Sequence, residues 1–102
     1  MRLHSLNIPD DSLAEVCRRH GVSRLALFGS VLRDDFGPES DVDVLVEFPP
    51  GQTPSLLDLG GLLMELRAIF GRDVDLKTPG FLSRYFRERV VSEARTIYAA
   101  QG

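Results

Sequence analysis

The segment of residues 41–48, DVDVLVEF, constrains the fold most, because it alternates aspartate with valine and then becomes almost fully apolar. Side chains along a β-strand alternate between its two faces, so Asp41 and Asp43 project to the same side. An apolar run bounded by turn residues is typical of a strand buried in a sheet. The sequence therefore predicts a buried strand that begins with two carboxylates.

Two shorter segments also have the character of strands. Residues 24–28 (RLALF) form an apolar run that ends at a Gly-Ser pair, and residues 73–76 (DVDL) repeat the acid–valine–acid pattern. By the same alternation, Asp73 and Asp75 project to one side of their strand. Four carboxylates can therefore converge if the two acidic strands lie close together.

Two helices are predicted between and before these strands. Residues 9–20 place acidic residues early and basic residues late around an apolar stripe, with Gly21 as a stop and His20 in a capping position. A second helix is predicted to start at Thr53 and Pro54, since this pair resembles an N-cap followed by proline in the first turn. The apolar stripe of this helix comprises Leu56, Leu59, Leu63, Leu66 and Phe70.

The C-terminal part of the chain is predicted to be helical as well. Thr78 and Pro79 resemble a helix start, and residues 81–100 place apolar side chains at helical spacing, which indicates one or two terminal helices. The predicted order is α-β-(α)-β-α-β-α. We expect one domain over residues 1–102, of the α/β (α+β) class, with a small mixed β-sheet flanked by helices.

Composition and charge exclude several classes of protein and ligand. The chain has 102 residues, 43% of them hydrophobic and 26% charged, as in a small folded domain. A net charge of −3 argues against binding to extended nucleic acid, which normally needs clustered basic charge. Cys17 is the single cysteine, so no internal disulfide is possible, in agreement with a reducing cytoplasm. The sequence has neither a signal peptide nor a run of about 18 apolar residues, so we expect a cytoplasmic protein without a membrane span.

The basic residues are almost all arginines, and Lys77 is the only lysine. Guanidinium groups suit bidentate contacts with phosphate or carboxylate better than ammonium groups do. This composition is compatible with phosphate chemistry but does not by itself indicate it.

The clustered aspartates indicate a metal site. Like charges packed together are unfavourable unless a cation neutralises them, and ligands that are all oxygen select a hard ion such as Mg²⁺. Mg²⁺ is usually held by a few carboxylates together with substrate phosphates. The turn at Gly29 and Ser30 adds a candidate phosphate site, because glycine lets the backbone approach an anion closely and the N-terminus of a following helix attracts it.

Each of these motifs also has an ordinary structural explanation. A Gly-Ser pair after a strand is often only a turn, and an Asp-x-Asp pair at a strand start is often a solvated edge. Arg33 could contact phosphate or pair with a neighbouring aspartate. Ser40 could orient the metal carboxylates, although local capping or turn formation is the usual role of serine beside aspartate.

Taken together, the motifs match a longer pattern. Residues 29–48, GSVLRDDFGPESDVDVLVEF, resemble the nucleotidyltransferase signature of Gly-Ser, a downstream arginine, and then Ser-Asp-hydrophobic-Asp-hydrophobic. The chain resembles the minimal nucleotidyltransferase (MNT) branch of the DNA polymerase beta-like superfamily, and the resemblance extends to residues 74–76. It differs at Asp34, where a glycine often follows the arginine, and at Asp73, which adds an acid beside Asp75.

The resemblance implies the nucleotidyltransferase fold and a role for each motif. Asp41 and Asp43 would bind two Mg²⁺ ions, while Asp75 would bind one of them and help to deprotonate the acceptor hydroxyl. The triphosphate of ATP or another nucleoside triphosphate would be contacted by Gly29, Ser30, Arg33 and Ser40. One ion would activate the attacking oxygen and the other would stabilise the leaving pyrophosphate.

The resemblance also implies a partner protein. Members of the MNT branch are often paired with a small helical HEPN ribonuclease toxin, and they act as antitoxins by transferring AMP to a tyrosine of that toxin. The alternative is a non-enzymatic antitoxin or binding module that neutralises a helical partner by occlusion. An enzyme that modifies a small molecule such as an aminoglycoside is disfavoured, because no acceptor domain is visible in the sequence.

Overall fold

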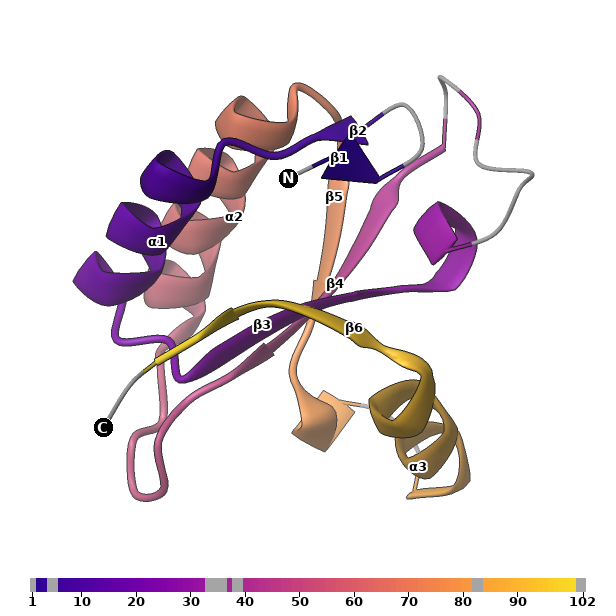
Figure 1. The fold of residues 1–102 in the computed structure, drawn as a ribbon. Coiled ribbons are helices and arrows are strands. Elements are labelled where there is room, and N and C mark those ends of the chain that lie inside the picture. Colours follow the sequence, from indigo (N-terminus) through magenta and orange to yellow (C-terminus); the bar gives the residue numbers. More distant parts are fainter. Residues whose placement is uncertain (1, 4–5, 33–36, 38–39, 82–83, 101–102) are drawn as a thin grey trace.

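A mixed four-stranded sheet forms the centre of the computed structural model, which describes residues 2–3, 6–32, 37, 40–81 and 84–100. The strand order is β5-β4-β3-β6. Strand β4 pairs antiparallel with β3 and parallel with β5, and β6 pairs antiparallel with β3 (Figure 1). The strands are β3 (Arg24–Phe28), β4 (Val42–Glu47), β5 (Val74–Lys77) and β6 (Arg95–Ala99). This arrangement confirms the predicted mixed sheet flanked by helices.

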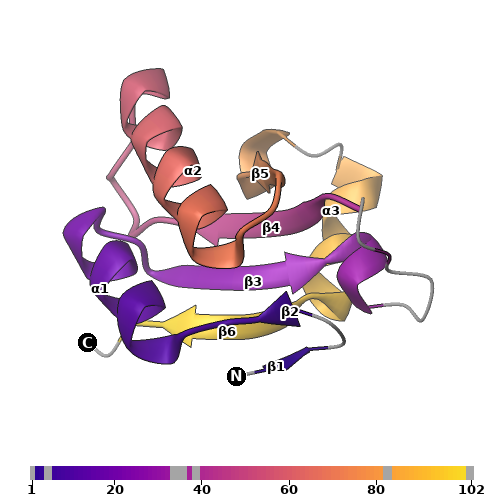
Figure 2. The ribbon, with the colours of Figure 1, turned by 90° about the horizontal axis from the view of Figure 1, so that it is seen from above.

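Two helices cover one face of the sheet, and one helix lies on the other. Helices α1 (Asp10–Arg19) and α2 (Leu56–Phe70) lie side by side, and α3 (Arg84–Glu93) lies on the opposite side (Figures 1 and 2). The core beneath α1 and α2 contains fully buried side chains of these two helices and of the sheet, among them Leu13, Leu62, Leu66, Val42, Val44 and Val46. The smaller cluster on the α3 side comprises Ala26, Phe28, Leu45 and Val90.

Short elements connect these layers. Strands β1 (Arg2–Leu3) and β2 (Leu6–Asn7) form a small antiparallel pair, and Leu6 is buried in the main core. A 3-10 helix, η1 (Gly29–Leu32), follows β3, and a second, η2 (Pro79–Phe81), follows β5. No helix within the described ranges combines the length and the apolar character that crossing a membrane requires.

The start of α2 differs from the prediction. Ser55, not Thr53, is the N-cap: its hydroxyl accepts a hydrogen bond from the Asp58 backbone N–H, and the Asp58 carboxylate accepts one from the Ser55 backbone N–H. This capping box satisfies two backbone donors that a helix start otherwise leaves without a partner, so it outweighs the Thr-Pro signal. Leu56 is consequently in the first turn, where it is 82% exposed and does not belong to the buried stripe.

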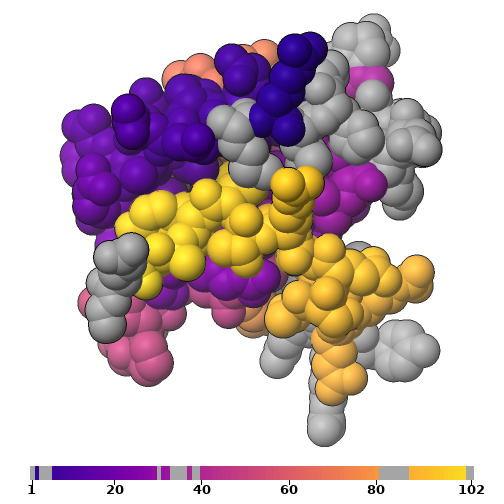
Figure 3. All heavy atoms as spheres, viewed as in Figure 1, coloured from indigo at the N-terminus to yellow at the C-terminus, as the bar shows by residue number. Residues whose placement is uncertain are grey.

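The C-terminal segment was predicted as helix throughout, and this prediction is wrong after Glu93. Residues 79–81 form only the short 3-10 helix, and residues 95–99 form the edge strand β6, which lies along the surface between α1 and α3 (Figures 1 and 3). The β-branched and aromatic side chains of Thr96, Ile97 and Tyr98 favour an extended chain. Pairing with β3 also satisfies the backbone groups along what would otherwise be an open edge of that strand.

A charged contact joins the two helices of the main layer. His20 is the C-cap of α1, as predicted, and its Nε2 lies in hydrogen-bond contact with Oε2 of Glu65 on α2. The Arg19 guanidinium donates a hydrogen bond of 2.6 Å to the other oxygen of the same carboxylate. These contacts, His20 first and then Arg19, hold the pKa of Glu65 below its ordinary value.

We expect the pH dependence of stability to report this contact. Because the folded state lowers the pKa of Glu65, the stabilisation is fully present above the ordinary value of 4.5 and is lost as pH falls through the folded value. The difference in free energy of unfolding between the parent and Glu65→Gln should therefore shrink as pH falls from about 6 to about 3 in urea denaturation. Glu88 is an exposed carboxylate on α3, so the same difference in free energy of unfolding between the parent and Glu88→Gln, followed over the same pH range, is the reference. If the difference in free energy of unfolding between the parent and Glu65→Gln stays constant over this pH range, the contact does not stabilise the ionised form of Glu65.

Candidate active site

Asp43 and Asp75 lie side by side on neighbouring strands. They are register partners in the parallel pair of β4 and β5, as are Val42 and Val74 one position earlier. Partner residues on adjacent strands project to the same face of a sheet. The two carboxylates therefore share one face of the sheet. They lie at the end of the sheet where both strands begin, as Figure 1 shows for the strands, and this end is called the acidic edge below.

These carboxylates are on the face opposite α1 and α2. Val42 and Val44 flank Asp43 and are fully buried in the core beneath those helices, so Asp43 points the other way. The antiparallel register agrees, since the partner of Asp43 on β3 is Phe28, which belongs to the cluster on the α3 side. The helical layer that supplies most of the core thus does not cover the acidic pair.

Asp41 lies two residues before Asp43 and just ahead of β4. Its side chain is exposed, whereas that of Asp43 is half-buried and that of Asp75 is 47% exposed. The start of β4 is fixed by a hydrogen bond of 2.9 Å from the Val42 backbone N–H to the Asp73 carbonyl. The acidic end of β4 is thus held against the start of β5.

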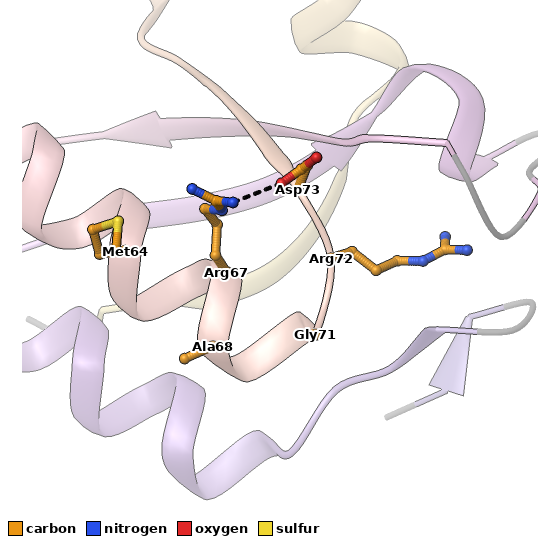
Figure 4. A pocket seen from close by; sticks show the side chains of 6 residues that line it. All are labelled: Met64, Arg67, Ala68, Gly71, Arg72 and Asp73. Carbon is orange, nitrogen blue, oxygen red and sulfur yellow. Dashed lines mark hydrogen bonds and ion pairs between the residues drawn. The ribbon is translucent and has the colours of Figure 1, made fainter.

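The expectation that four carboxylates converge is wrong for Asp73. Its side chain is 70% exposed, and it accepts a hydrogen bond of 2.8 Å from Arg67 of α2 (Figure 4). Asp73 follows the turn at Gly71 that ends α2, and the contact with Arg67 directs its carboxylate toward that helix. It contributes to the turn and not to the acidic face.

A shallow hollow of about 590 Å³ adjoins this turn. Figure 4 shows Arg67 reaching Asp73 across it, while Arg72 points away from Met64. The Arg72 side chain donates a hydrogen bond of 2.6 Å to the Gly37 carbonyl and so fixes the chain ahead of β4. The hollow is lined by Met64, Arg67, Ala68, Gly71, Arg72 and Asp73, none of which lies on the acidic face.

Gly29 lies directly against the Asp43 carboxylate. Its φ is +73°, and a Cβ added to it would be 2.2 Å from Oδ2 of Asp43. Two separate constraints, a left-handed backbone and a lack of space, thus require glycine at this position. Val31, two residues later, is fully buried and anchors the 3-10 helix η1 in the core. The glycine–serine turn is thereby placed beside the acidic pair.

The other predicted nucleotide ligands can be placed only in part. The Ser40 hydroxyl accepts a hydrogen bond of 3.1 Å from the Gly37 backbone N–H, and the Ser40 N–H donates one of 3.1 Å to the Gly37 carbonyl. These contacts are those of a turn, the structural role that is usual for serine beside aspartate. The side chain of Ser30 and the whole of Arg33 lie outside the described residues, so their roles stay predictions.

Lys77 lies next to Asp75, although it was not among the site residues predicted from the sequence. Its Nζ is 3.4 Å from Oδ1 of Asp75. The two residues are two positions apart on β5, so strand alternation alone places them on one face. Applying that rule beyond the aspartates would have identified Lys77 from the sequence.

The donor chemistry of this edge suits a hard divalent cation. Asp41, Asp43 and Asp75 offer only carboxylate oxygens, which Mg²⁺ prefers over the nitrogen and sulfur ligands of softer metals. Within the described part of the chain, no three acidic, histidine or cysteine side chains are already grouped tightly enough to hold a metal ion. In the arrangement seen here, Asp75 contacts Lys77 instead.

Comparisons with known proteins agree with this geometry. The family model of the nucleotidyltransferase domain matches residues 10–98 of this chain. A Methanocaldococcus jannaschii protein, provisionally named a protein adenylyltransferase, is 41% identical over 76 residues, which are 74% of this chain and 80% of that protein. The protein adenylyltransferase MntA of Thermococcus cleftensis is 37% identical over 79 residues, 78% of each chain.

A solved structure shares the fold. A toxin–antitoxin crystal structure with AMP-PNP superimposes with a TM-score of 0.72 at 21% identity, over 92% of this chain and 76% of that one. At this identity the likeness concerns the arrangement of helices and strands. It places a chain of this fold in a complex that was crystallised with a nucleotide analogue.

Proposed function

Because the chain belongs to the nucleotidyltransferase domain family, we propose that it transfers AMP from ATP, with the help of divalent metal ions, to a hydroxyl group of a partner protein. The observation that carries this proposal is the register of β4 and β5, which sets Asp43 beside Asp75 on the face that α1 and α2 do not cover, next to Gly29. An acidic pair beside a close-approach glycine is the arrangement that a metal-bound triphosphate needs.

In this proposal the three aspartates divide the tasks of metal binding and proton removal. Asp41 and Asp43 would hold two Mg²⁺ ions, and Asp75 would hold one of them and help to deprotonate the acceptor hydroxyl. The acceptor oxygen forms a bond to the α-phosphorus while the bond from that phosphorus to the bridging oxygen breaks, and pyrophosphate leaves. When bound, the two ions would supply positive charge to the triphosphate and lower the pKa of the attacking hydroxyl.

The triphosphate is proposed to lie along the glycine–serine turn. Gly29 has no side chain of its own, so its backbone lies directly against the Asp43 carboxylate, beside which the metal-bound phosphates would be held. Ser30, Arg33 and Ser40 are the further candidates for contacts with the phosphates. The Arg72 contact with Gly37 would then hold the segment that leads from this turn into β4.

The proposed acceptor is a tyrosine of a helical toxin of the HEPN class, with this chain as its antitoxin. The support comes from the names of the relatives, which are protein adenylyltransferases, and from the solved neighbour, which is a toxin–antitoxin complex. Both concern those proteins, and their extension to this chain is the proposal.

The proposal predicts that a helical toxin of the HEPN class is encoded beside this gene, and incubation of that protein with this chain, Mg²⁺ and ATP tests it. We expect the intact mass of the partner to rise by one or more adenylyl units, located on tyrosine by peptide mapping, with no increase when Asp43→Asn replaces the parent. A partner that keeps its mass, but loses its toxicity equally with parent and Asp43→Asn, would contradict the proposal and indicate neutralisation by occlusion.

A further inference from the structure

The only lysine of the chain contacts a carboxylate of the acidic edge. Lys77 is on β5, and its Nζ is 3.4 Å from Oδ1 of Asp75. Its side chain is 41% exposed and that of Asp75 is 47% exposed, so both can move without disturbing the core. The register places Lys77 opposite Leu45, two positions further along the strands than the pair of Asp43 and Asp75.

This ion pair differs from those that join separate parts of the fold. Arg24 with Glu47, and Arg67 with Asp73, each fasten one element or turn to another. Lys77 and Asp75 are on the same short strand, two residues apart, so their contact fastens no separate elements. Its effect is local: it places a positive charge on the carboxylate.

An ammonium group and a metal ion compete for the same carboxylate lone pairs. Lysine is a compact charge on a flexible four-carbon stem, which can leave a carboxylate without a change in the backbone. A divalent cation that binds Asp75 must displace it or coordinate beside a like charge. We infer that Lys77 opposes divalent-metal binding at Asp75 in the nucleotide-free protein, so that this carboxylate becomes a full metal ligand only when the metal ion displaces Lys77. The inference rests on the metal site of the proposed function.

The alternative role for the positive charge of Lys77 is a direct contact with the triphosphate. The glycine–serine turn lies against Asp43, whereas Lys77 is displaced along β5 in the direction away from the start of the strands. An extended strand rises about 3.3 Å per residue, so Lys77 begins roughly 7 Å beyond Asp75 along β5. The geometry therefore favours competition for Asp75 over phosphate binding.

Titration of the nucleotide-free protein with Mn²⁺ alone, with free Mn²⁺ measured by electron paramagnetic resonance, tests the inference without any turnover. We expect Lys77→Met to tighten Mn²⁺ binding about two- to five-fold, the range that corresponds to an exposed ion pair. Lys77→Arg should bind like the parent, because it keeps the charge. Arg89→Met removes a positive charge from an exposed pair on α3 and should leave the affinity unchanged.

A double-mutant cycle locates the effect at Asp75. In the Asp75→Asn background, Lys77→Met should no longer change the affinity, since the carboxylate for which both cations compete is gone. If the parent and Lys77→Met bind Mn²⁺ with equal affinity while Asp43→Asn abolishes binding, the inference about Lys77 is overturned and the metal site of the proposed function is not. The inference is also overturned if the Lys77→Met effect persists without the Asp75 carboxylate, or if Lys77→Met only raises the KM for ATP. A parent that shows no Mn²⁺ binding sensitive to Asp43 would remove the metal site of the proposed function as well.

Discussion

Asp43→Asn is expected to lower the rate of nucleotidyl transfer by about a thousandfold or more, because it removes the central ligand charge of the acidic edge. Asparagine has nearly the same shape, so packing against Gly29 and the register with Asp75 should persist. The lost charge is worth several kcal/mol of transition-state stabilisation when it positions metal ions on a triphosphate, which is the source of the expected factor. The measurement is the initial rate of AMP transfer from labelled ATP, with thermal unfolding as a check on the fold.

The chain contains a matched control for this variant. Asp73→Asn makes the same chemical change in the second Asp-Val-Asp segment, at a carboxylate that contacts Arg67. Its transfer rate should stay within about threefold of the parent, since an exposed ion pair contributes little. Equal losses in the two variants would mean that the acidic edge does not carry the chemistry.

Gly29→Ala is expected to lower transfer about a hundredfold and to destabilise the fold. The added Cβ would be 2.2 Å from Oδ2 of Asp43, so the carboxylate or the turn must shift. Displacing a catalytic group by about 1 Å can cost two orders of magnitude in rate. The positive φ of +73° adds about 1–2 kcal/mol of backbone strain for any residue with a Cβ.

Gly51→Ala separates the two contributions. Gly51 has a φ of +84°, and nothing lies within 4 Å of where its Cβ would be. The Gly51→Ala variant should therefore lose about 1–2 kcal/mol of free energy of unfolding in urea denaturation, which matches the backbone strain expected in Gly29→Ala. Its transfer rate should stay near that of the parent. A Gly29→Ala protein that is as active as Gly51→Ala would contradict the close packing of the turn on Asp43.

The parts of the fold that could be predicted are those whose pattern is local. Strands β3 and β4 were recognisable because each contains a short apolar run, and β5 because it repeats the acid–valine–acid pattern of β4. The alternation of side chains placed Asp43 and Asp75 on defined faces. Residues 95–99 were mistaken for helix because they become a strand only by pairing with β3, far away in the sequence. A helical period also fits such a short segment, so the pattern alone could not decide.

The candidate site shows the same division between local and non-local information. That Asp43 lies next to Asp75 depends on β4 and β5 being parallel neighbours, which the pattern of each strand by itself does not show. The close approach of Gly29 to Asp43 could not be predicted, because it depends on how the turn packs after Val31 is buried. Asp73 was misplaced since the pattern does not show where a turn ends and a strand begins.

The position of β6 also has a consequence for biosynthesis. A ribosome releases the chain from its N-terminus, so β3 emerges long before β6, its partner on that side. Until β6 arrives, the nascent chain presents a row of unsatisfied amides and carbonyls to neighbouring polypeptides. Completion of the sheet thus waits for the synthesis of residues 95–99, and a chain cut short before residue 95 would be left with a surface prone to aggregation.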